Sequence, residues 1–304
     1  MKVSLVVPVF GVESYIAQCA QSLFSQTYRD IQFIFVNDGT RDRSMEVLSE
    51  VMARFPDREV CIINQENAGL PHARAAGTAR AEGEYILHVD SDDWIEPDTV
   101  EALVDCVEKT GADVVYFDFY MEYPGRTRSK RAGSYAPGDR IGFIQDIFQY
   151  KAPGYVWNKF CRRDLFDGLH WPDYPMNEDT VTMAQVLYKS RNIRYLQRFL
   201  YHYRRSDRRS LSYQPHAVRD VQAARNFLDF YTRFWNGPER EMVDGVRDDI
   251  ILRSAWMACR YDLGLFSDYP FLRKEALQTP LRMHCAFKLR RQILLKCILP
   301  FKGR

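Results

Sequence analysis

The sequence lacks the patterns that mark several large classes of protein. No run approaches the roughly 18 consecutive apolar residues that a membrane-spanning helix needs. No GxGxxG follows a strand-like run, as a dinucleotide-binding oxidoreductase would require. The seven cysteines form no CxxC pair, which excludes the common zinc and dithiol motifs. The net charge of the 304 residues is only +2, so the composition does not indicate nucleic-acid binding.

The cysteines and the first residues bear on the cellular compartment. The cysteines are scattered and odd in number, which favours a reducing environment. The start, MKVSLVVPVFGVESY, contains a short apolar run, but Pro8 and then Glu13 interrupt it before a signal-peptide core is complete. We therefore predict a buried first strand and a cytoplasmic protein. With 46% apolar and 27% charged residues, the chain has the composition of a globular protein.

The first part of the chain alternates between two hydrophobic periods. Short β-branched or aromatic runs predict strands at 3–10, 31–38, 59–65, 84–90 and 112–120. Amphipathic stretches between them predict helices at 13–26, 43–55, 72–83 and 97–111. This alternation predicts an α/β fold with a mostly parallel sheet covered by helices on both faces. In such sheets ligands bind beyond the carboxyl ends of the strands.

The rest of the chain has a different pattern. Residues 123–140 are rich in glycine, proline, serine and basic side chains, which predicts a mobile loop beside the ligand-binding edge. From residue 141 the pattern is helical, with one strand-like stretch at 193–204. We predict a first domain over residues 1–213 and a helical C-terminal region over 214–304.

Three aspartates crowd into four positions at the end of the run at 84–90. Asp90 and Asp92 are two residues apart, so extended chain aims both carboxylates to one side, and Asp93 follows directly. Such carboxylates repel one another unless a cation joins them, and their oxygen atoms suit Mg²⁺ or Mn²⁺. Because Mg²⁺ usually takes its other ligands from water and substrate phosphates, the cluster predicts a phosphate-bearing substrate. The alternative is an acidic cap for the helix after Pro97.

Two weaker signals lie on the same predicted edge. Asp38, in VNDGT, can accept hydrogen bonds from a base or a ribose, although the same residues make a good turn. Gly69 and Arg74, in NAGLPHAR, offer close backbone approach and a positive charge for a phosphate or carboxylate. On an ordinary helix surface Arg74 would be a solvated charge.

A second acidic centre begins the predicted helix NEDTVTMAQVLYKS. Asn177 is placed to cap this helix, and Glu178 and Asp179 stand in its first turn. The two acids can complement the helix dipole, or one of them is the base that transfer to a hydroxyl group requires. Further on, YHYRRSDRRSLS places Arg204 and Ser210 in a basic loop, which either clamps a diphosphate or is a solvated turn.

The order of these segments resembles that of the inverting nucleotide-sugar glycosyltransferases of family 2, which have the GT-A fold. That family shows Pro-x-Tyr/Phe-Asn after the first strand, followed by DDGS-like, NxGxxxARN, DSDD and ED segments. This chain has PVFG, NDGT, NAGLPHARA, DSDD and NED in the same order, within residues 1–213. It departs at Gly11, where the family usually has Asn, and at Ala75, where Asn often follows the Arg.

The resemblance implies a role for each motif residue. Asp179 would be the general base that deprotonates the acceptor hydroxyl for in-line attack with inversion, and Glu178 beside it would contact the sugar or the acceptor. Asp90 and Asp92 would hold a divalent metal, Mg²⁺ or Mn²⁺, against the diphosphate. The residues that would bind the nucleotide-sugar are Pro8, Phe10, Glu13, Asp38, Arg74, Asp90, Ser91, Asp92, Arg204 and Ser210.

The implied activity is metal-dependent transfer of a hexose or an N-acetylhexosamine from a nucleotide-diphospho-sugar, with UDP as the expected nucleotide. The acceptor would be a hydroxyl group of a saccharide or a lipid-linked oligosaccharide in surface polysaccharide biosynthesis, flanked by Trp157 and Lys159. The alternative is a catalytically silent GT-A-fold protein that acts as a binding module or scaffold. The joint presence of Asp90, Asp92 and Asp179 favours the enzyme.

The end of the chain is basic. No acidic residue follows Glu275, and residues 282–304 interleave Lys and Arg with Phe, Leu and Ile. An amphipathic basic helix of this kind can lie on an anionic membrane surface, or it can pack on the domain with its cations reaching water. We predict peripheral attachment to the inner face of the cell membrane through this tail.

Overall fold

A nine-stranded sheet forms the centre of the computed structural model, which describes residues 1–136, 138–205 and 215–278. The strands are β1 (Val3–Val9), β2 (Ile31–Asn37), β3 (Glu59–Asn64), β4 (Tyr85–His88), β5 (Trp94–Ile95), β6 (Val114–Tyr123), β7 (Arg126–Lys130), β8 (Lys159–Arg162) and β9 (Ile193–Arg204). Their order across the sheet is β3–β2–β1–β4–β8–β6–β9–β5, and β7 pairs with β6.

Half of the eight strand pairs that the structure describes run parallel, including every pair among β1, β2, β3 and β4, as the alternation of strand and helix predicts. β1 pairs in parallel with β2 and β4, β2 with β3, and β6 with β9. Only the pairs that involve β5, β7 and β8 are antiparallel among the described strands. The helical pattern after residue 141 did not predict β8, because a four-residue buried strand is too short to show a period.

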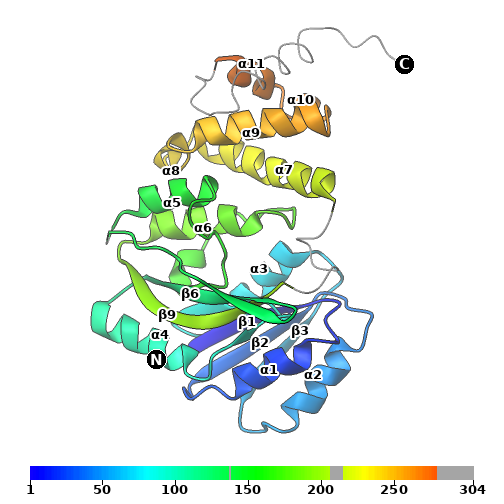
Figure 1. Cartoon of the computed structure of the whole chain (residues 1–304), viewed down its shortest axis with the longest axis vertical. Helices are drawn as coiled ribbons and strands as arrows, with labels where there is room; N and C mark the ends of the chain where they lie inside the picture. Colours follow the sequence, from blue (N-terminus) through cyan, green and yellow to red (C-terminus); the bar gives the residue numbers. More distant parts are fainter. Residues whose placement is uncertain (137, 206–214, 279–304) are drawn as a thin grey trace.

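Helices cover both faces of this sheet (Figure 1). One face carries α1 (Ile16–Phe24), α2 (Ser44–Met52) and α4 (Thr99–Thr110), and the other carries α3 (Leu70–Arg80), α5 (Arg140–Phe148) and α6 (Glu178–Lys189). A short 3₁₀ helix, η1 (Arg163–Phe166), follows β8. The predicted α/β architecture is confirmed.

The residues of β1 alternate between the two cores. Val3, Leu5 and Val7 pack with α1, α2 and α4, whereas Val6 packs with α3 on the opposite face. A Cβ at Gly77 would collide with the Val6 side chain, so the glycine allows α3 to lie close against the sheet. This close packing fixes the position of α3 and of the residues one turn before Gly77.

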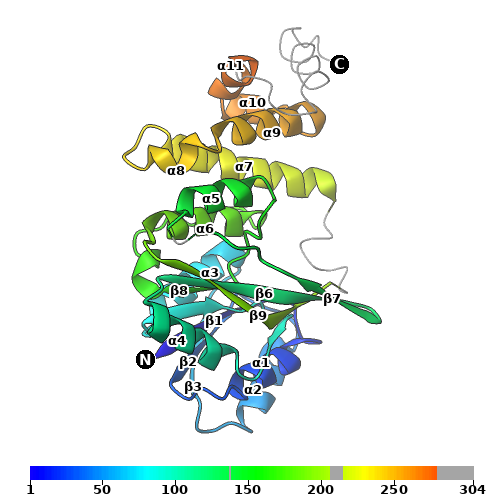
Figure 2. The same cartoon turned by 60° about the vertical axis from the view of Figure 1, so that its left-hand side comes forward.

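The segment predicted as a mobile loop contains a β-hairpin instead. β6 and β7 pair in register from Phe119–Lys130 to Tyr123–Arg126, and the hairpin projects from the body of the molecule (Figure 2). Every residue of β7 is exposed, so its sequence lacks the alternation by which a half-buried strand is recognised. The Arg126 and Arg128 guanidiniums lie 4.9 and 5.7 Å from the Tyr123 ring centroid, which supports this exposed strand.

The C-terminal region is helical over the residues that the structure describes. Its helices are α7 (His216–Phe234), α8 (Arg240–Asp244), α9 (Arg247–Arg260), α10 (Leu265–Asp268) and α11 (Phe271–Gln278). They stack beyond α5 and α6 on the side away from the sheet (Figure 1), and one hydrophobic cluster extends from Val6 to Ala276. The proposed boundary at residue 213 and the basic tail at 282–304 lie outside the described residues. Within those residues, no helix combines the length and apolar character needed to cross a membrane.

Candidate active site

Adjacent strand ends bring the motif residues to one edge of the sheet. Phe10 follows β1, Asp38 follows β2 and Asp90 follows β4, and these strands are neighbours in the sheet. Phe10 is 54% exposed, although a large apolar side chain at a strand end would normally be covered. Asp38 is buried and Asp90 is partly buried. The edge therefore presents an open aromatic surface beside carboxylates.

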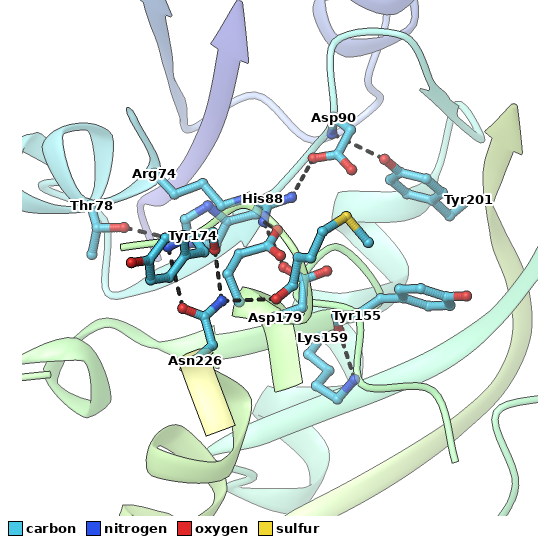
Figure 3. A network of polar contacts seen from close by, with 12 residues as sticks. Arg74, Thr78, His88, Asp90, Tyr155, Lys159, Tyr174, Asp179, Tyr201 and Asn226 are labelled. Carbon is cyan, nitrogen blue, oxygen red and sulfur yellow. Dashed lines mark hydrogen bonds and ion pairs between the residues drawn. The ribbon is translucent and has the colours of Figure 1, made fainter. Parts of the chain in front are cut away.

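Arg74 joins the two acidic centres that the sequence separates (Figure 3). Its Nη2 donates to Asp90 Oδ1 at 2.7 Å, and its Nη1 donates to Glu178 Oε1 at 2.7 Å and Asp179 Oδ1 at 2.5 Å. The Arg74 side chain is only 2% exposed, so these ion pairs are shielded from water. Arg74 was expected to approach the nucleotide or its phosphates. It instead holds the candidate metal carboxylate and the candidate base in one network.

Burial and the shared Arg74 guanidinium determine the pKa values of the carboxylates in this network. Burial lowers the pKa of Arg74, but the three carboxylates raise it more, so the guanidinium stays charged. Burial raises the pKa of Asp179, and Asp90 adds to this shift while Arg74 opposes it. Burial and the neighbouring Asp179 also raise the pKa of Glu178 well above its ordinary value. Asp179 is thus a carboxylate with raised basicity, which suits a general base.

Asp93 is a structural member of the aspartate cluster. Its carboxylate accepts hydrogen bonds from the Tyr201 hydroxyl at 2.8 Å and from the Arg204 backbone N–H at 2.7 Å. The same Tyr201 oxygen accepts from the backbone N–H of Asp90 at 3.0 Å. Burial raises the pKa of Asp93 well above its usual range, and the charges of Asp92 and Asp90 add to that. These contacts fix the backbone on which Asp90, Ser91 and Asp92 stand.

Arg204 lies directly against the aspartate segment. Its Nε donates to the Asp92 carbonyl at 2.8 Å and its Nη2 to Gln18 Oε1 at 2.6 Å. The guanidinium carbon is 4.7 Å from the centroid of the Tyr15 ring and 4.8 Å from that of Trp94. Arg204 is thus placed beside the candidate metal residues, whereas Ser210, its predicted companion, lies outside the described residues.

Asp38 organises the loop that enters α3. Its Oδ1 accepts from Gln65 Nε2 at 2.8 Å and from the Ala68 N–H at 2.9 Å, and its Oδ2 accepts from the Gly69 N–H at 2.9 Å. Gly39 has a φ of 70°, and a Cβ there would come within 2.9 Å of Asn67 N. A base would therefore meet an Asp38 carboxylate already held in place by the loop between β3 and α3.

Two other predicted pocket residues differ in exposure. Pro8 is buried inside β1. Glu13 is exposed in the loop between β1 and α1, where it contacts the residues just before α2. The Glu13 carboxylate accepts from the Arg43 N–H at 3.1 Å, and its own N–H donates to Asp42 Oδ2 at 3.0 Å. Pro8 therefore acts through the shape of β1, while Glu13 has a side chain that a ligand can reach.

Trp157 and Lys159 lie in the interior instead of facing an acceptor. Each is 1% exposed, and Trp157 stacks on Tyr201 with ring centroids 4.3 Å apart. Lys159 Nζ donates to the carbonyls of Pro153 and Tyr155 at 2.9 and 2.7 Å, and to Asn158 Oδ1 at 2.8 Å. Direct contact with an acceptor is excluded by this burial. Burial also lowers the pKa of Lys159 to about 7.

Hydrogen bonds from α7 hold the segment that precedes α6 in place. Asn226 of α7 donates to the carbonyls of Tyr174 and Met176 at 2.7 and 2.8 Å, and accepts from the Tyr174 N–H at 3.2 Å (Figure 3). Asn177 occupies the N-cap position of α6, but its side chain makes no capping bond and donates to the Tyr150 hydroxyl at 2.6 Å. Sequence reasoning missed Asn226, because a polar residue within an amphipathic helix gives no local signal of its distant partner.

The Asp90 and Asp92 carboxylates fit a divalent metal ion that takes its remaining ligands from a substrate and from water. Within the described ranges, no group of three or more His, Cys, Asp and Glu side chains could hold a metal by itself. Asp90 and Asp92 are both partly exposed, and one Asp90 oxygen is engaged by Arg74. Two carboxylates suffice for Mg²⁺ or Mn²⁺ when a diphosphate and water supply the remaining ligands.

The chain belongs to glycosyltransferase family 2, as the ordered motifs predicted. The family model "Glycosyl transferase family 2" matches residues 4–169, more than half of the chain. EpsH of Bacillus subtilis (strain 168), a glycosyltransferase by name, is 34% identical over 210 residues, which are 66% of this chain and 60% of EpsH. Glycosyltransferase GlyA of Streptococcus pneumoniae serotype 4 is 33% identical over 213 residues, which are 67% of this chain and 30% of GlyA. The chain thus spans less than two thirds of either relative.

Solved structures show the same fold at low sequence identity. TarS 1–349 of S. aureus, in complex with UDP-GlcNAc, superposes with a TM-score of 0.67 and 17% identity, covering 98% of this chain and 81% of that one. The mannosyltransferase PcManGT from Pyrobaculum calidifontis, in complex with GDP-Man and Mn²⁺, has a TM-score of 0.55 and 11% identity, covering 98% of this chain and 86% of that one. The expected GT-A fold is confirmed by these likenesses.

Proposed function

We propose that this chain is a metal-dependent inverting glycosyltransferase that moves a sugar from a UDP-sugar to a saccharide hydroxyl group. The observation that carries the proposal is the bridge made by Arg74, which ties Asp90 to Asp179 although 89 positions separate them in the sequence. A donor bound at Asp90 and an acceptor deprotonated by Asp179 would therefore meet in one site. This closeness is what direct transfer with inversion requires.

Asp179 is the proposed general base. Its carboxylate stands in the first turn of α6, and burial raises its pKa, so it takes up a proton more readily than an exposed aspartate. Arg74 donates to its Oδ1, and the Val156 backbone N–H also donates to this carboxylate, which is proposed to take up the proton of the acceptor hydroxyl. Glu178 shares the same guanidinium and fixes its direction, and a contact between Glu178 and the sugar remains part of the proposal.

Asp90 and Asp92 are the proposed metal ligands. A divalent ion bound there would neutralise the charge that grows on the diphosphate leaving group. Ser91 between them is buried, and the Tyr201–Asp93 contacts hold the segment rigid. Arg204, tied to the Asp92 carbonyl, places a further positive charge on the same side, and Ser210 is proposed to close over the diphosphate with it.

The nucleotide is proposed to lie across the ends of β1 and β2. Phe10 offers an exposed ring for the base, Pro8 shapes the strand beneath it, and Asp38 and Glu13 supply carboxylates on either side. UDP is the proposed nucleotide because of the resemblance at the Asp38 segment. The TarS complexes with UDP-GlcNAc and UDP are consistent with that choice.

The test is release of UDP from a panel of UDP-sugars by the full chain, with Mn²⁺, with Mg²⁺ and with EDTA. We expect turnover of one or a few UDP-sugars that EDTA abolishes. Asp92→Asn is expected to lose donor binding, whereas Asp179→Asn is expected to bind the donor but not transfer it. If no UDP-sugar is bound or turned over under any metal condition, the scaffold alternative is favoured.

We further propose a saccharide or lipid-linked acceptor in surface polysaccharide synthesis at the inner face of the membrane. The support is the basic tail at 282–304, together with the similarity to EpsH. Vesicle flotation tests the membrane part: the full chain should float with anionic vesicles at low salt, and a chain ending at residue 281 should not. Equal flotation of both would contradict membrane binding by the tail.

A further inference from the structure

A cavity opens between the helical region and the start of α6. Its volume is about 400 Å³, within the usual range for small-ligand sites of about 300–1,000 Å³. Tyr150, Asn177, Arg219, Asp220, Arg253 and Ser254 supply its polar lining. Asn177 lies two residues before Asp179, so the cavity adjoins the helical turn that carries the proposed base.

Two buried polar atoms in the walls of this cavity have no hydrogen-bond partner in the part of the chain that the structure describes. Ser254 is 0% exposed, and its hydroxyl has no hydrogen-bond partner among the described residues. The same holds for Arg253 Nε, which is also buried. The Arg253 guanidinium lies 4.7 Å from the Tyr150 ring centroid, and no carboxylate of the described chain pairs with it. Buried donors without partners cost free energy unless a ligand or water satisfies them.

The backbone around the cavity is held in an unusual conformation. Tyr150 and Asn177 are the two non-glycine residues with positive φ among the described residues, at 57° and 58°. They contact each other through the Asn177 Nδ2 to Tyr150 hydroxyl bond, and both line the cavity. Tyr150 is 59% exposed, so its ring is open to a ligand. Conformations of this kind persist where the surrounding structure holds them, often at binding sites.

Charge and shape together indicate the class of ligand. An exposed aromatic ring stacks on the face of a sugar, and Asp220 can accept bonds from sugar hydroxyl groups. Arg219 is 3.8 Å from Asp220, whereas Arg253 has no paired carboxylate within residues 1–136, 138–205 and 215–278. Guanidinium groups bind carboxylate and phosphate through paired hydrogen bonds. A neutral sugar would leave Arg253 unsatisfied.

We propose that this cavity is the acceptor site and that it takes a saccharide whose terminal unit carries a carboxylate or phosphate group, bound by Arg253 and Ser254. The assignment rests on the proposed function, because Asp179 must deprotonate a hydroxyl of the same ligand. Tyr150 stacks on the sugar, and Asn177 holds the Tyr150 hydroxyl in place. α7 and α9 thereby determine acceptor specificity, while the sheet edge binds the donor.

Ligand-observed NMR titration of the full chain tests the assignment with D-glucuronate, glucose 6-phosphate, methyl glucoside and inorganic phosphate. We expect one of the two charged sugars to bind about tenfold or more tightly than methyl glucoside and than phosphate alone. Whichever charged sugar binds identifies the anion as a carboxylate or a phosphate. Arg253→Gln should reduce its affinity to that of the neutral sugar. Arg260→Gln, an exposed arginine on the same helix, is the matched control and should change nothing.

Ala223→Trp provides a second variant, since it fills the cavity from α7 without removing a charge. It should abolish binding of the charged sugar while leaving UDP binding with Mn²⁺ intact. Equal affinity for charged and neutral sugars, or an unchanged affinity in Arg253→Gln, would overturn the assignment. UDP binding is measured on the same samples. If the wild type does not bind UDP, the proposed function fails. If it binds UDP but shows no preference for charged sugars, only the cavity assignment fails.

Discussion

At the scale of single residues, one arginine determines the arrangement of the site. Three carboxylates around a buried cation would repel one another without it, and burial alone would favour their neutral forms. Arg74 keeps the network together because its forked guanidinium reaches Asp90 with one nitrogen and Glu178 and Asp179 with the other. Lysine presents a single nitrogen and could not reproduce this geometry.

Removal of Arg74 should therefore destabilise the fold as well as the site. We expect Arg74→Met to lower the free energy of unfolding by about 3–5 kcal/mol, because it leaves buried carboxylates without their cation. Urea denaturation measures this change. Arg80→Met, at the exposed end of the same helix, is the control and should shift stability by less than about 0.5 kcal/mol. Similar stabilities for the two variants would contradict the role of Arg74.

Asp179 should give the activity a characteristic pH dependence. A general base works only when ionised, and burial raises the pKa of Asp179, so kcat/KM should fall with decreasing pH while an ordinary aspartate is still ionised. Below that raised pKa the carboxylate is protonated and the rate declines tenfold per pH unit. A pH profile of UDP-sugar transfer measures this limb. Activity that stays flat down to about pH 4, the range of an unperturbed aspartate, would exclude Asp179 as the base.

Substitution of Asp179 by Asn should separate donor binding from the transfer step. Asp179→Asn keeps the size of the side chain but cannot accept a proton, so kcat should fall by about 10²–10⁴-fold. The dissociation constant for UDP with Mn²⁺ should change little, because Asp90 and Asp92, not Asp179, are the proposed ligands of the metal. Isothermal titration and initial rates together measure both quantities. Loss of UDP binding at an unchanged fold would indicate that Asp179 belongs to the donor site.

At the scale of elements, α7 controls the segment that leads into α6. Asn226 is buried and makes three hydrogen bonds to Tyr174 and Met176. We expect Asn226→Ala to lower stability by about 1–3 kcal/mol, since backbone groups of a buried segment lose their partner. The rate of sugar transfer should fall by a larger factor than the affinity for UDP. Thr232→Ala, which removes only a bond to the Leu228 carbonyl within α7, is the control and should leave transfer unchanged.

The loop at 153–158 depends on Lys159 in a similar way. Burial lowers the pKa of Lys159 to about 7, so between pH 7 and its ordinary pKa of 10.5 the unfolded chain binds a proton that the folded chain does not. Stability contributed by this group therefore rises with pH through that window. The wild type should gain about 2 kcal/mol relative to Lys159→Met between pH 7 and 9, as measured by urea denaturation. A pH-independent difference between the two proteins would contradict the lowered pKa.

These elements also show what sequence could and could not predict. The strands and helices of the first 120 residues were predicted, except the two-residue β5, because each has a clear period of its own. The β6–β7 hairpin was missed because β7 is exposed on all its residues. Trp157 and Lys159 were assigned to the acceptor, since local sequence does not report whether a side chain is covered by distant parts of the chain.

At the scale of the whole molecule, the sheet edge and the helical region meet around α6. The family motifs predicted that Phe10, Asp38 and Asp90 gather at one edge, because they follow neighbouring strands of one sheet. The partners of Arg74 could not be predicted in the same way, since the bond to Glu178 joins residues 104 positions apart. The hydrogen bonds from Asn226 of α7 to the segment before α6 had no motif at all and emerge only from the fold.

The most direct test of the central claim is the thermal stability of the full chain with UDP, with and without Mn²⁺, compared with Asp92→Ala. UDP at a hundred times its dissociation constant should add about 2.7 kcal/mol to the wild type when Mn²⁺ is present. We predict this shift for UDP with Mn²⁺, little shift for UDP alone, and none for Asp92→Ala, whose backbone carbonyl can still accept from Arg204. An equal shift without metal or in Asp92→Ala, or no shift in the wild type, would contradict a UDP-sugar site built on these aspartates.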